Sequence, residues 1–328
     1  MILVTGGAGF IGSNLVAGLE QSGAGPLAVC DRTGAGDGGR TVAKRRLEAT
    51  IEPEALFPFL DAHRAEMRAV FHLGAISSTM ETDASLFARN NYRLSLDLWR
   101  WCAAADVRFI YASSAATYGD GAMGFDDDGS QSALAALRPL NLYGRSKHLF
   151  DRRVAALVAK GAAQPPQWAG LKFFNVYGPN EYHKGNQKSV VATAYAAAAA
   201  GQPVRLFKSY YAKYADGGQL RDFVWVGDCV AVMLWLLQHE DVSGLFNVGS
   251  GRARSFEDLA KALFAALGRA PEIEYIDMPE SIRDRYQYYT EARMTRLRDA
   301  GFDQPPTSLE AGVANYVRDY LTQEDPYR

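Results

Sequence analysis

The sequence predicts an α/β protein built on a doubly wound parallel sheet. Short apolar runs recur along the first 174 residues, and each is followed by a stretch with helical periodicity. Strands buried on both faces appear as continuous apolar runs, and their alternation with helices of about 10–15 residues is typical of parallel βαβ units. After Asn175 this rhythm changes, which predicts a second and smaller unit.

Five apolar runs mark the expected strands of the first unit, at residues 2–4, 27–30, 70–73, 109–112 and 171–174. Between them we expect one helix over residues 10–22, a long helix that follows Ala75 and runs through Trp101, and a third helix over roughly 142–160. Residues 33–40 are rich in glycine, which predicts a flexible loop.

The second unit is less regular. Residues 190–200 predict a helix of small side chains, and residues 208–220 a polar loop. Strands are predicted at 222–226 and 246–249, with a helix between them, and both are expected to join the large sheet. From Ser255 the chain is mostly helical, with one strand near 273–276. We therefore expect a first domain of residues 1–174 plus about 222–249. A smaller, mostly helical domain of residues 175–221 plus about 250–328 is expected to be interleaved with it.

Composition narrows the possible classes of protein. The chain has 328 residues, a formal net charge of −2 and 48% hydrophobic residues, which is ample for a sizeable core. This charge balance does not support nucleic-acid or membrane-surface partners. Three isolated cysteines and the absence of a signal-peptide or membrane-span pattern predict a cytoplasmic protein. The five histidines are scattered without metal-ligand spacing, so no metal is expected.

A glycine pattern follows the first predicted strand. Residues 7–12 read Gly-Ala-Gly-Phe-Ile-Gly, between a strand and a helix. Such glycines permit a tight turn and let the backbone approach a pyrophosphate at the helix N-terminus. Asp31, nineteen residues after Gly12, ends the second predicted strand, where a carboxylate accepts hydrogen bonds from ribose hydroxyls. The pattern predicts a tightly bound dinucleotide.

Basic residues surround Asp31. Arg32 follows it directly, and Arg40, Lys44 and Arg45 lie in and after the glycine-rich loop. A guanidinium beside the ribose can pair with a 2′-phosphate, which favours NADP over NAD. The alternative for these side chains is a solvated basic loop, and NAD stays open with it.

A Tyr-x-x-x-Lys pair, Tyr143 and Lys147, follows Ser113-Ser114 by about thirty residues. Positions i and i+4 of a helix share a face, so both side chains are expected to point into the same space. An ammonium about 4 Å from a phenol is worth roughly 4 kcal/mol at an effective dielectric near 20, or about three pKa units. Lys147 is therefore expected to lower the pKa of Tyr143, which would take a proton from an alcohol as hydride leaves the same carbon. A serine hydroxyl, that of Ser114, is expected to hold the alcohol oxygen.

Longer motifs resemble those of the extended short-chain dehydrogenases/reductases that modify nucleotide sugars, over essentially the whole chain. The motifs are the glycine turn at 5–12, His-Leu-Gly-Ala at 72–75, Ser-Ser-Ala-Ala-Thr-Tyr-Gly at 113–119, Tyr-Gly-Arg-Ser-Lys at 143–147, Asn-Val-Tyr-Gly-Pro at 175–179, Arg-Asp-Phe-Val at 221–224 and Phe-Asn-Val-Gly at 246–249. His-Lys-Gly at 183–185, Arg-Tyr-Gln at 285–287 and Gly-Phe at 301–302 make the chain most similar to the ADP-heptose 6-epimerases of lipopolysaccharide core synthesis.

The resemblance implies roles for individual residues. Tyr143 and Lys184 match the two acid/base residues on opposite faces of the substrate, although from spacing alone Lys184 would be a solvated loop residue. Ser114 matches the hydroxyl-anchoring serine, and Lys147 the ribose-binding partner of Tyr143. The expected cofactor contacts are Gly7, Gly9, Phe10, Ile11, Gly12, Asp31, Arg32, Arg40, Leu73, Gly74, Ala75, Ile76, Ser77, Asn90, Lys147, Val176 and Lys184. The expected substrate contacts are Ser114, Asn175, Asn186, Thr193, Phe207, Lys208, Ser209, Tyr210, Arg221 and Tyr286.

The implied activity is epimerisation at C6 of ADP-heptose, by transient oxidation and re-reduction with permanently held NADP. The implied assembly is a homo-oligomer, a pentamer in the family. The chain departs from the family pattern at Arg32, where an Asn is usual, at Asn186, where a Ser is usual, and in a longer 208–220 segment.

Three alternatives to this activity stay open. The first is a 4-epimerase or a 4,6-dehydratase of another nucleotide sugar, although Ala115-Ala116 stand where a dehydratase has Asp-Glu. The second, from another class, is a non-catalytic NAD(P)-sensing protein, although such proteins usually lose the Tyr or the Lys. The third is a net reductase that exchanges its cofactor.

Overall fold

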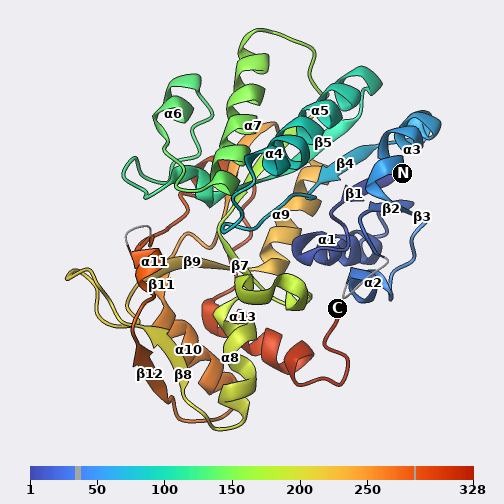
Figure 1. The fold of residues 1–328 in the computed structure, drawn as a ribbon. Coiled ribbons are helices and arrows are strands. Elements are labelled where there is room, and N and C mark those ends of the chain that lie inside the picture. The colour runs from blue at the N-terminus through green and yellow to red at the C-terminus, as the bar shows by residue number, and fades with distance from the viewer. Residues whose placement is uncertain (34–37, 284–285) are drawn as a thin grey trace.

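The computed structural model describes residues 1–33, 38–283 and 286–328. The strands of the large sheet are β1 (Ile2–Thr5), β2 (Leu27–Cys30), β3 (Ala49–Ile51), β4 (Ala69–His72), β5 (Arg108–Ser114), β6 (Trp168–Phe173) and β10 (Gly244–Val248). Their order is β10-β6-β5-β4-β1-β2-β3, and every pair is parallel (Figure 1). The predicted doubly wound parallel sheet is confirmed. Of these seven strands, only β3, a three-residue edge strand with a single buried side chain, is absent from the sequence prediction.

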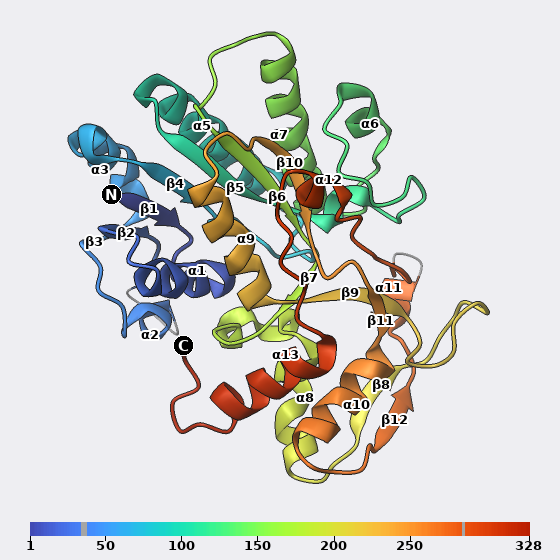
Figure 2. The same ribbon diagram turned by 180° about the vertical axis from the view of Figure 1, so that it is seen from behind.

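Helices cover both faces of this sheet. Figure 1 shows α5 (Leu94–Ala105) and α7 (Leu142–Ala159) on one face, and Figure 2 shows α9 (Val226–Gln238) on the other, where it packs against α1 (Phe10–Gln21). The shorter helices are α2 (Gly38–Val42), η1 (Pro53–Ala55), α3 (Leu56–Ala62), η2 (Arg64–Glu66), η4 (Ala115–Tyr118), α6 (Gln131–Ala136) and α12 (Thr295–Asp299). None of the described helices is long and apolar enough to span a membrane.

Two expectations about segments need correction. The long helix after β4 begins only at α4 (Ala84–Phe87), because the side chain of Asp83 caps it by accepting from Ser85 N and Leu86 N; it then continues through the π-turn η3 (Ala88–Arg93) into α5. Helix α2 already begins at Gly38, inside the predicted glycine-rich loop, whose residues 34–37 lie outside the described part of the chain.

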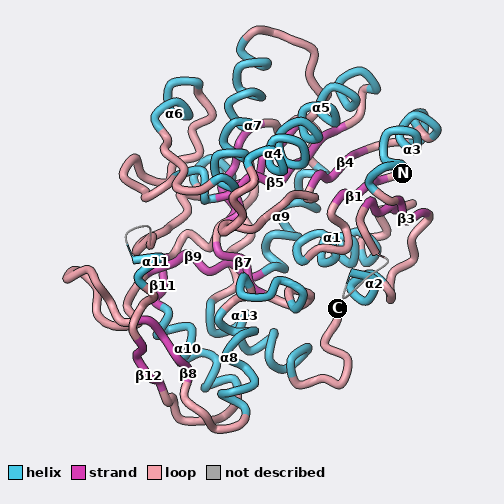
Figure 3. Tube along the Cα trace, in the orientation of Figure 1, coloured by secondary structure: helices cyan, strands magenta, loops and turns pink. Residues whose placement is uncertain are grey.

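The remaining segments form a smaller region with two short sheets. One has the order β11 (Ala253–Ser255), β9 (Leu220–Trp225) and β7 (Asn175–Tyr177), and the other pairs β12 (Ile273–Ile276) with β8 (Val204–Phe207). The helices are η5 (Tyr182–Gln187), α8 (Val190–Ala199), α10 (Phe256–Ala266), α11 (Glu280–Arg283), α13 (Leu309–Tyr316) and η6 (Val317–Leu321). Residues 208–219 are loop throughout, as predicted (Figure 3).

Strand β9 contradicts one expectation. The sequence predicts that both later strands join the large sheet, but only β10 does, by pairing with β6, whereas β9 pairs with β7 and β11. Neighbouring side chains on a strand point to opposite faces. Val224 packs in the apolar core of the large sheet, and Phe223 packs in a second core with side chains of α10 and α13. β9 therefore connects two cores instead of extending the large sheet.

A buried histidine holds two neighbouring strand ends together. Ser95 Oγ donates its single proton to Asn91 O at 2.6 Å, so it accepts from His72 Nε2 at 2.9 Å. His72 Nδ1 then accepts from Thr5 Oγ1 at 2.7 Å, and the same Thr5 oxygen accepts from Gly74 N at 3.3 Å. This chain of hydrogen bonds requires a neutral imidazole and joins the ends of β1 and β4.

We expect His72 to make the stability of the fold depend on pH. Burial, and to a lesser degree the charge of Lys147, lower the pKa of His72 to about 3. Because the pKa is depressed in the folded state, this stability is present above the unfolded value near 6.5 and is lost as the pH falls toward 3. As the pH falls below 6.5, the free energy of unfolding should decrease less steeply in the His72→Gln variant than in the wild type. The difference should be up to about 1.4 kcal/mol per pH unit.

Urea unfolding at a series of pH values between 7.5 and 4.5 measures how steeply the free energy of unfolding depends on pH. The matched control is His63→Gln, since the His63 side chain is 35% exposed and lies outside this hydrogen-bond chain. Equal slopes for wild type and His72→Gln would contradict the prediction.

Candidate active site

A cavity of about 910 Å³ lies at the carboxyl ends of the parallel strands. This is the edge at which open α/β sheets bind ligands. The sequence-predicted residues that line it come from the glycine turn, from the ends of β2, β4 and β5, and from α7, β7 and η5. They are Gly9, Phe10, Ile11, Gly12, Asp31, Leu73, Gly74, Ala75, Ile76, Ser77, Ser114, Tyr143, Lys147, Asn175, Val176 and Lys184.

The glycine turn closes tightly at one end of the cavity. A Cβ atom on Gly12 would lie 2.0 Å from the carbonyl oxygen of Gly6, so no larger residue fits there. This leaves the N-terminus of α1 open toward the cavity, where a helix favours an anion. Asp31 is anchored beside it: its Oδ2 accepts from Ala8 N at 2.9 Å, and its Oδ1 accepts from Arg32 N at 2.8 Å.

The four basic residues near Asp31 all have partners. Arg32 pairs with Glu54, and its side chain is 68% exposed. Lys44 Nζ lies 2.8 Å from Asp325, and Arg45 pairs with Glu20 at 2.7 Å. Arg40 stacks on the Tyr327 ring, 4.4 Å from its centroid. Exposed pairs such as Arg32–Glu54 contribute little stability, so Arg32 can exchange its partner for a ligand.

Helix α7 meets the turn η4 in direct contact. Asn141 caps the helix by accepting from Gly144 N at 2.8 Å. A Cβ on Gly144 would lie 2.6 Å from Ala116 O, so the glycine within Tyr-Gly-Arg-Ser-Lys is required for this contact. That role of Gly144 was not predicted from the sequence. The contact brings Tyr143 and Ser114 to the same cavity, where the Ser114 hydroxyl acts to lower the pKa of Tyr143.

The expected lowering of the pKa of Tyr143 by Lys147 is not found. Burial raises the pKa of Tyr143, and the Ser114 hydroxyl opposes this rise while Asp151 adds to it. Desolvation of the phenol is the largest of these effects, and the charge of Lys147 is not one of them. Lys147 is itself only 3% exposed, and burial lowers its pKa to about 8, against the opposing effect of Asp151. Both side chains line the same cavity, as the i, i+4 spacing predicts.

Lys184 also lines this cavity and is not a solvated loop residue. Its Nζ lies 5.1 Å from the centroid of the Phe10 ring, and burial lowers its pKa while Glu181 opposes this effect. Glu181 is fully buried and accepts from Ser189 N and Ser189 Oγ, both at 2.6 Å. These bonds hold the turn η5 so that Lys184 faces the glycine turn.

Arg221 lies next to the cavity but is not one of the residues that line it. It is 7% exposed, and no ion pair to a carboxylate is found for it among the described residues. Its guanidinium lies 5.6 Å from the ring of Phe256, which lines the cavity, and 5.2 Å from the ring of Tyr286. The Phe207 ring packs against Tyr286 with centroids 6.4 Å apart. A buried arginine without a carboxylate partner suits an anionic group such as a diphosphate.

Other predicted residues lie away from the cavity lining. Gly7 packs under the turn against Val29. Asn90 Nδ2 donates to Leu86 O, and Thr193 is exposed on α8. Lys208 and Tyr210 both bond Asp277, and Ser209 Oγ donates to Tyr211 O. The side chain of Asn186, and Arg285 of the Arg-Tyr-Gln motif, lie outside the part of the chain that the structure describes.

Two of the lining residues, Gln287 and Thr290, are missing from the predicted contacts. Gln287 donates to Gly119 O at 2.7 Å, and Thr290 bonds Asn175 at 3.4 Å and accepts from Asp222 N at 3.1 Å. Both come from the last fifth of the chain and reach the site only through tertiary packing. Gln287 could have been noticed as part of the Arg-Tyr-Gln motif.

Comparison with known proteins agrees with this geometry. Residues 2–249 match the NAD dependent epimerase/dehydratase family. Over their full lengths, the chain is 48% identical to an ADP-L-glycero-D-manno-heptose-6-epimerase of Nitratidesulfovibrio vulgaris and 44% identical to one of Fusobacterium nucleatum.

Solved structures show the same relationship. The crystal structure of the Helicobacter pylori ADP-L-glycero-D-manno-heptose-6-epimerase matches 97% of this chain and 95% of its own, with a TM-score of 0.79 and 27% identity. The Thermus thermophilus UDP-glucose 4-epimerase in complex with NAD matches 96% of this chain and 97% of its own, with a TM-score of 0.75 and 26% identity. The chain therefore belongs to the NAD dependent epimerase/dehydratase family, among the ADP-L-glycero-D-manno-heptose-6-epimerases, and is an isomerase.

Proposed function

We propose that this protein interconverts ADP-D-glycero-D-manno-heptose and ADP-L-glycero-D-manno-heptose at C6, using tightly held NADP. The observation that carries the proposal is that Tyr143 and Lys184, from α7 and η5, line one cavity together with the glycine turn. Inversion at an exocyclic carbon needs an acid/base group on each face, and these two side chains supply them. The 48% identity to a relative of the same name supports the choice of sugar.

The residues present fit a dinucleotide. The close contact of Gly12 with Gly6 leaves the α1 N-terminus open for the pyrophosphate, and Asp31 is placed for the ribose. When bound, the dinucleotide supplies a reversible hydride acceptor. We favour NADP because Arg32 is exposed beside Asp31 and can leave Glu54 for a 2′-phosphate.

The side chains divide the remaining work. Ser114 holds the substrate oxygen, and Tyr143 exchanges a proton with it on one face. After the keto group has rotated to present its other face, Lys184 exchanges a proton with the substrate oxygen on that face. Lys147 contributes positive charge next to the phenolate and binds the ribose. Arg221, with Tyr286 and Phe207 beside it, binds the diphosphate of the sugar nucleotide.

We also propose how the chain and its copies are organised. Residues 1–174 and about 222–249 bind the dinucleotide, although β9 lies outside the large sheet. Residues 175–221 and about 250–328 bind the sugar nucleotide. The enzyme acts in the cytoplasm, in the synthesis of lipopolysaccharide core heptose, as a homo-oligomer.

Substitution of the two acid/base residues tests the mechanism. Tyr143→Phe and Lys184→Met should each slow epimerisation by about 10²- to 10⁴-fold, the usual contribution of a general acid or base. Both variants should retain the dinucleotide, because neither change disturbs the glycine turn. Turnover of ADP-heptose and the retained nucleotide are measured together.

Lys160→Met is the matched control, since Lys160 is exposed at the other end of α7. Near-normal turnover in Lys184→Met would indicate a single-base enzyme, such as a 4-epimerase acting on another sugar.

The cofactor preference is tested by denaturing the purified protein and chromatographing the released nucleotide. NADP should be released, and Arg32→Ala should weaken NADP retention relative to NAD by about tenfold or more, the worth of a charge-assisted hydrogen bond. Arg100→Ala is the matched control. The Arg100 side chain is similarly exposed, at 61%, but it lies on α5 and not beside Asp31. Release of NAD alone, with no effect of Arg32→Ala, would refute the preference for NADP.

The path of the hydrogen can be followed with isotopes. Product formed in heavy water should contain no deuterium at C6, because hydrogen leaves and returns as hydride while only oxygen-bound protons exchange with water. Substrate deuterated at C6 should turn over more slowly and keep its label. Mass spectrometry of the product measures both, and incorporation of solvent deuterium at C6 would indicate carbanion chemistry instead.

A further inference from the structure

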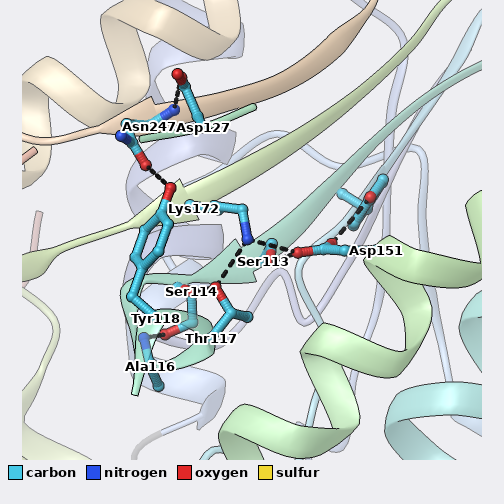
Figure 4. Close-up of polar contacts among 10 residues, drawn as sticks. Ser113, Ser114, Ala116, Thr117, Tyr118, Asp127, Asp151, Lys172 and Asn247 are labelled. Carbon is cyan, nitrogen blue, oxygen red and sulfur yellow. Dashed lines mark hydrogen bonds and ion pairs between the residues drawn. The ribbon is translucent and has the colours of Figure 1, made fainter. Parts of the chain in front are cut away.

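A charged pair lies completely buried beneath the serine turn. Lys172 of β6 and Asp151 of α7 are both 0% exposed, and Lys172 Nζ lies 2.9 Å from Asp151 Oδ2 (Figure 4). The same ammonium donates to Thr117 Oγ1 at 2.7 Å and lies 4.9 Å from the centroid of the Tyr118 ring. Both charges are therefore fully enclosed, and neither lines the cavity.

Such a pair adds little to stability. Removing two charges from water costs about as much as their attraction returns, so apolar side chains of the same volume are often as stable. The pair does fix the orientation of the groups around it, because each of its hydrogen bonds joins a particular donor to a particular acceptor. Its partners, rather than its energy, indicate its role.

One arm of the network orients Ser114. Lys172 can only donate, so Thr117 Oγ1 accepts from it and must direct its own proton elsewhere. That proton goes to the carbonyl oxygen of Ser114, at 2.8 Å. Ser114 Oγ meanwhile accepts from Ala116 N at 3.1 Å. Its backbone carbonyl and one lone pair of its oxygen are thus engaged, which leaves the Ser114 hydroxyl proton free to point toward Tyr143, the neighbour in the cavity lining whose pKa this hydroxyl acts to lower.

The other arm sets the position of α7 against β5. Asp151 Oδ2 accepts from Ser113 Oγ at 2.7 Å, and Oδ1 accepts from Tyr111 Oη at 3.0 Å. Asp151 follows Lys147 by one helical turn and Tyr143 by two, so all three lie on one helix face. Rotation or sliding of α7 would break these bonds. The network thus joins the strand that presents Ser114 to the helix that presents Tyr143.

We propose that Lys172, Asp151 and Thr117 are positioning residues for the epimerisation, which align the Ser114 hydroxyl with Tyr143 through the Lys172–Thr117–Ser114 and Asp151–Ser113 hydrogen bonds. This inference rests on the function proposed above. It assigns the residues no contact with substrate or dinucleotide. Their effect should therefore be on the rate of turnover and not on substrate binding.

Thr117→Val is the principal test, because valine has nearly the same shape, lacks the hydroxyl and leaves the ion pair in place. We expect kcat per retained dinucleotide to fall about tenfold to a hundredfold, the effect of small misalignment, with KM changed less than about twofold. Thr117→Ser restores the hydroxyl and should recover most of the rate. Thr322→Val is the matched control, since Thr322 Oγ1 also donates to a backbone carbonyl, that of Val317, far from the cavity.

The ion pair is tested with a double variant. Lys172→Met alone leaves a buried carboxylate uncompensated and can prevent folding. Asp151→Asn with Lys172→Met removes both charges together, and it should fold, retain the dinucleotide and still lose kcat. A rate within twofold of the wild type for Thr117→Val or for the double variant would overturn the proposal, as would failure of Thr117→Ser to recover the rate.

Crystal structures of wild type, Thr117→Val and the double variant supply a readout that needs no turnover. The distance between the hydroxyl oxygens of Ser114 and Tyr143 should increase in both variants while the strands stay in place. An unchanged distance would overturn the inference even if the rates fall. If the wild type does not epimerise ADP-heptose, the proposed function fails, and this geometric comparison still decides the positioning role.

Discussion

The whole site depends on the parallel arrangement of seven strands, which brings their carboxyl ends to one edge. Connections between parallel strands pass over the faces as helices, so each strand end leads into a turn at the same edge. The glycine turn follows β1, Asp31 follows β2, and Ser114 ends β5, and all three line one cavity. Residues more than a hundred positions apart are thereby placed in a single site.

Burial competes with charge throughout this site. Lys147 and Lys172 are almost completely removed from solvent, and each would be costly without a compensating group. Asp151 lies between them: it pairs with Lys172 at 2.9 Å and raises the pKa of Lys147 against the effect of burial. One carboxylate therefore serves two cations on different elements. The sharing is possible because Asp151 follows Lys147 by one turn of α7 and contacts Lys172 of β6.

Local patterns predicted most of the elements, because a buried strand and an amphipathic helix are visible within a short stretch of sequence. The strands β1, β2, β4, β5 and β6 and the helices α1, α7 and α8 lie close to their predicted positions. The errors concern long-range pairing and local caps. Nothing within residues 222–226 distinguishes a strand of the large sheet from one that pairs with β7 and β11. The late start of the helix after β4 depends on the capping side chain of Asp83.

The sequence by itself determined the glycine turn with Asp31, the placement of Ser114 at a strand end and the shared face of Tyr143 and Lys147, since each follows from spacing within one or two elements. Only the tertiary structure decided the environment of these groups. Burial raises the pKa of Tyr143 where the spacing suggested a lowering, and Lys184 faces the cavity where the spacing suggested solvent. The assignments of site residues to cofactor and substrate stay predictions. The physical reason for the division is that desolvation and long-range contacts depend on every element packed around a group, whereas helical and strand spacing depend only on the residues nearby.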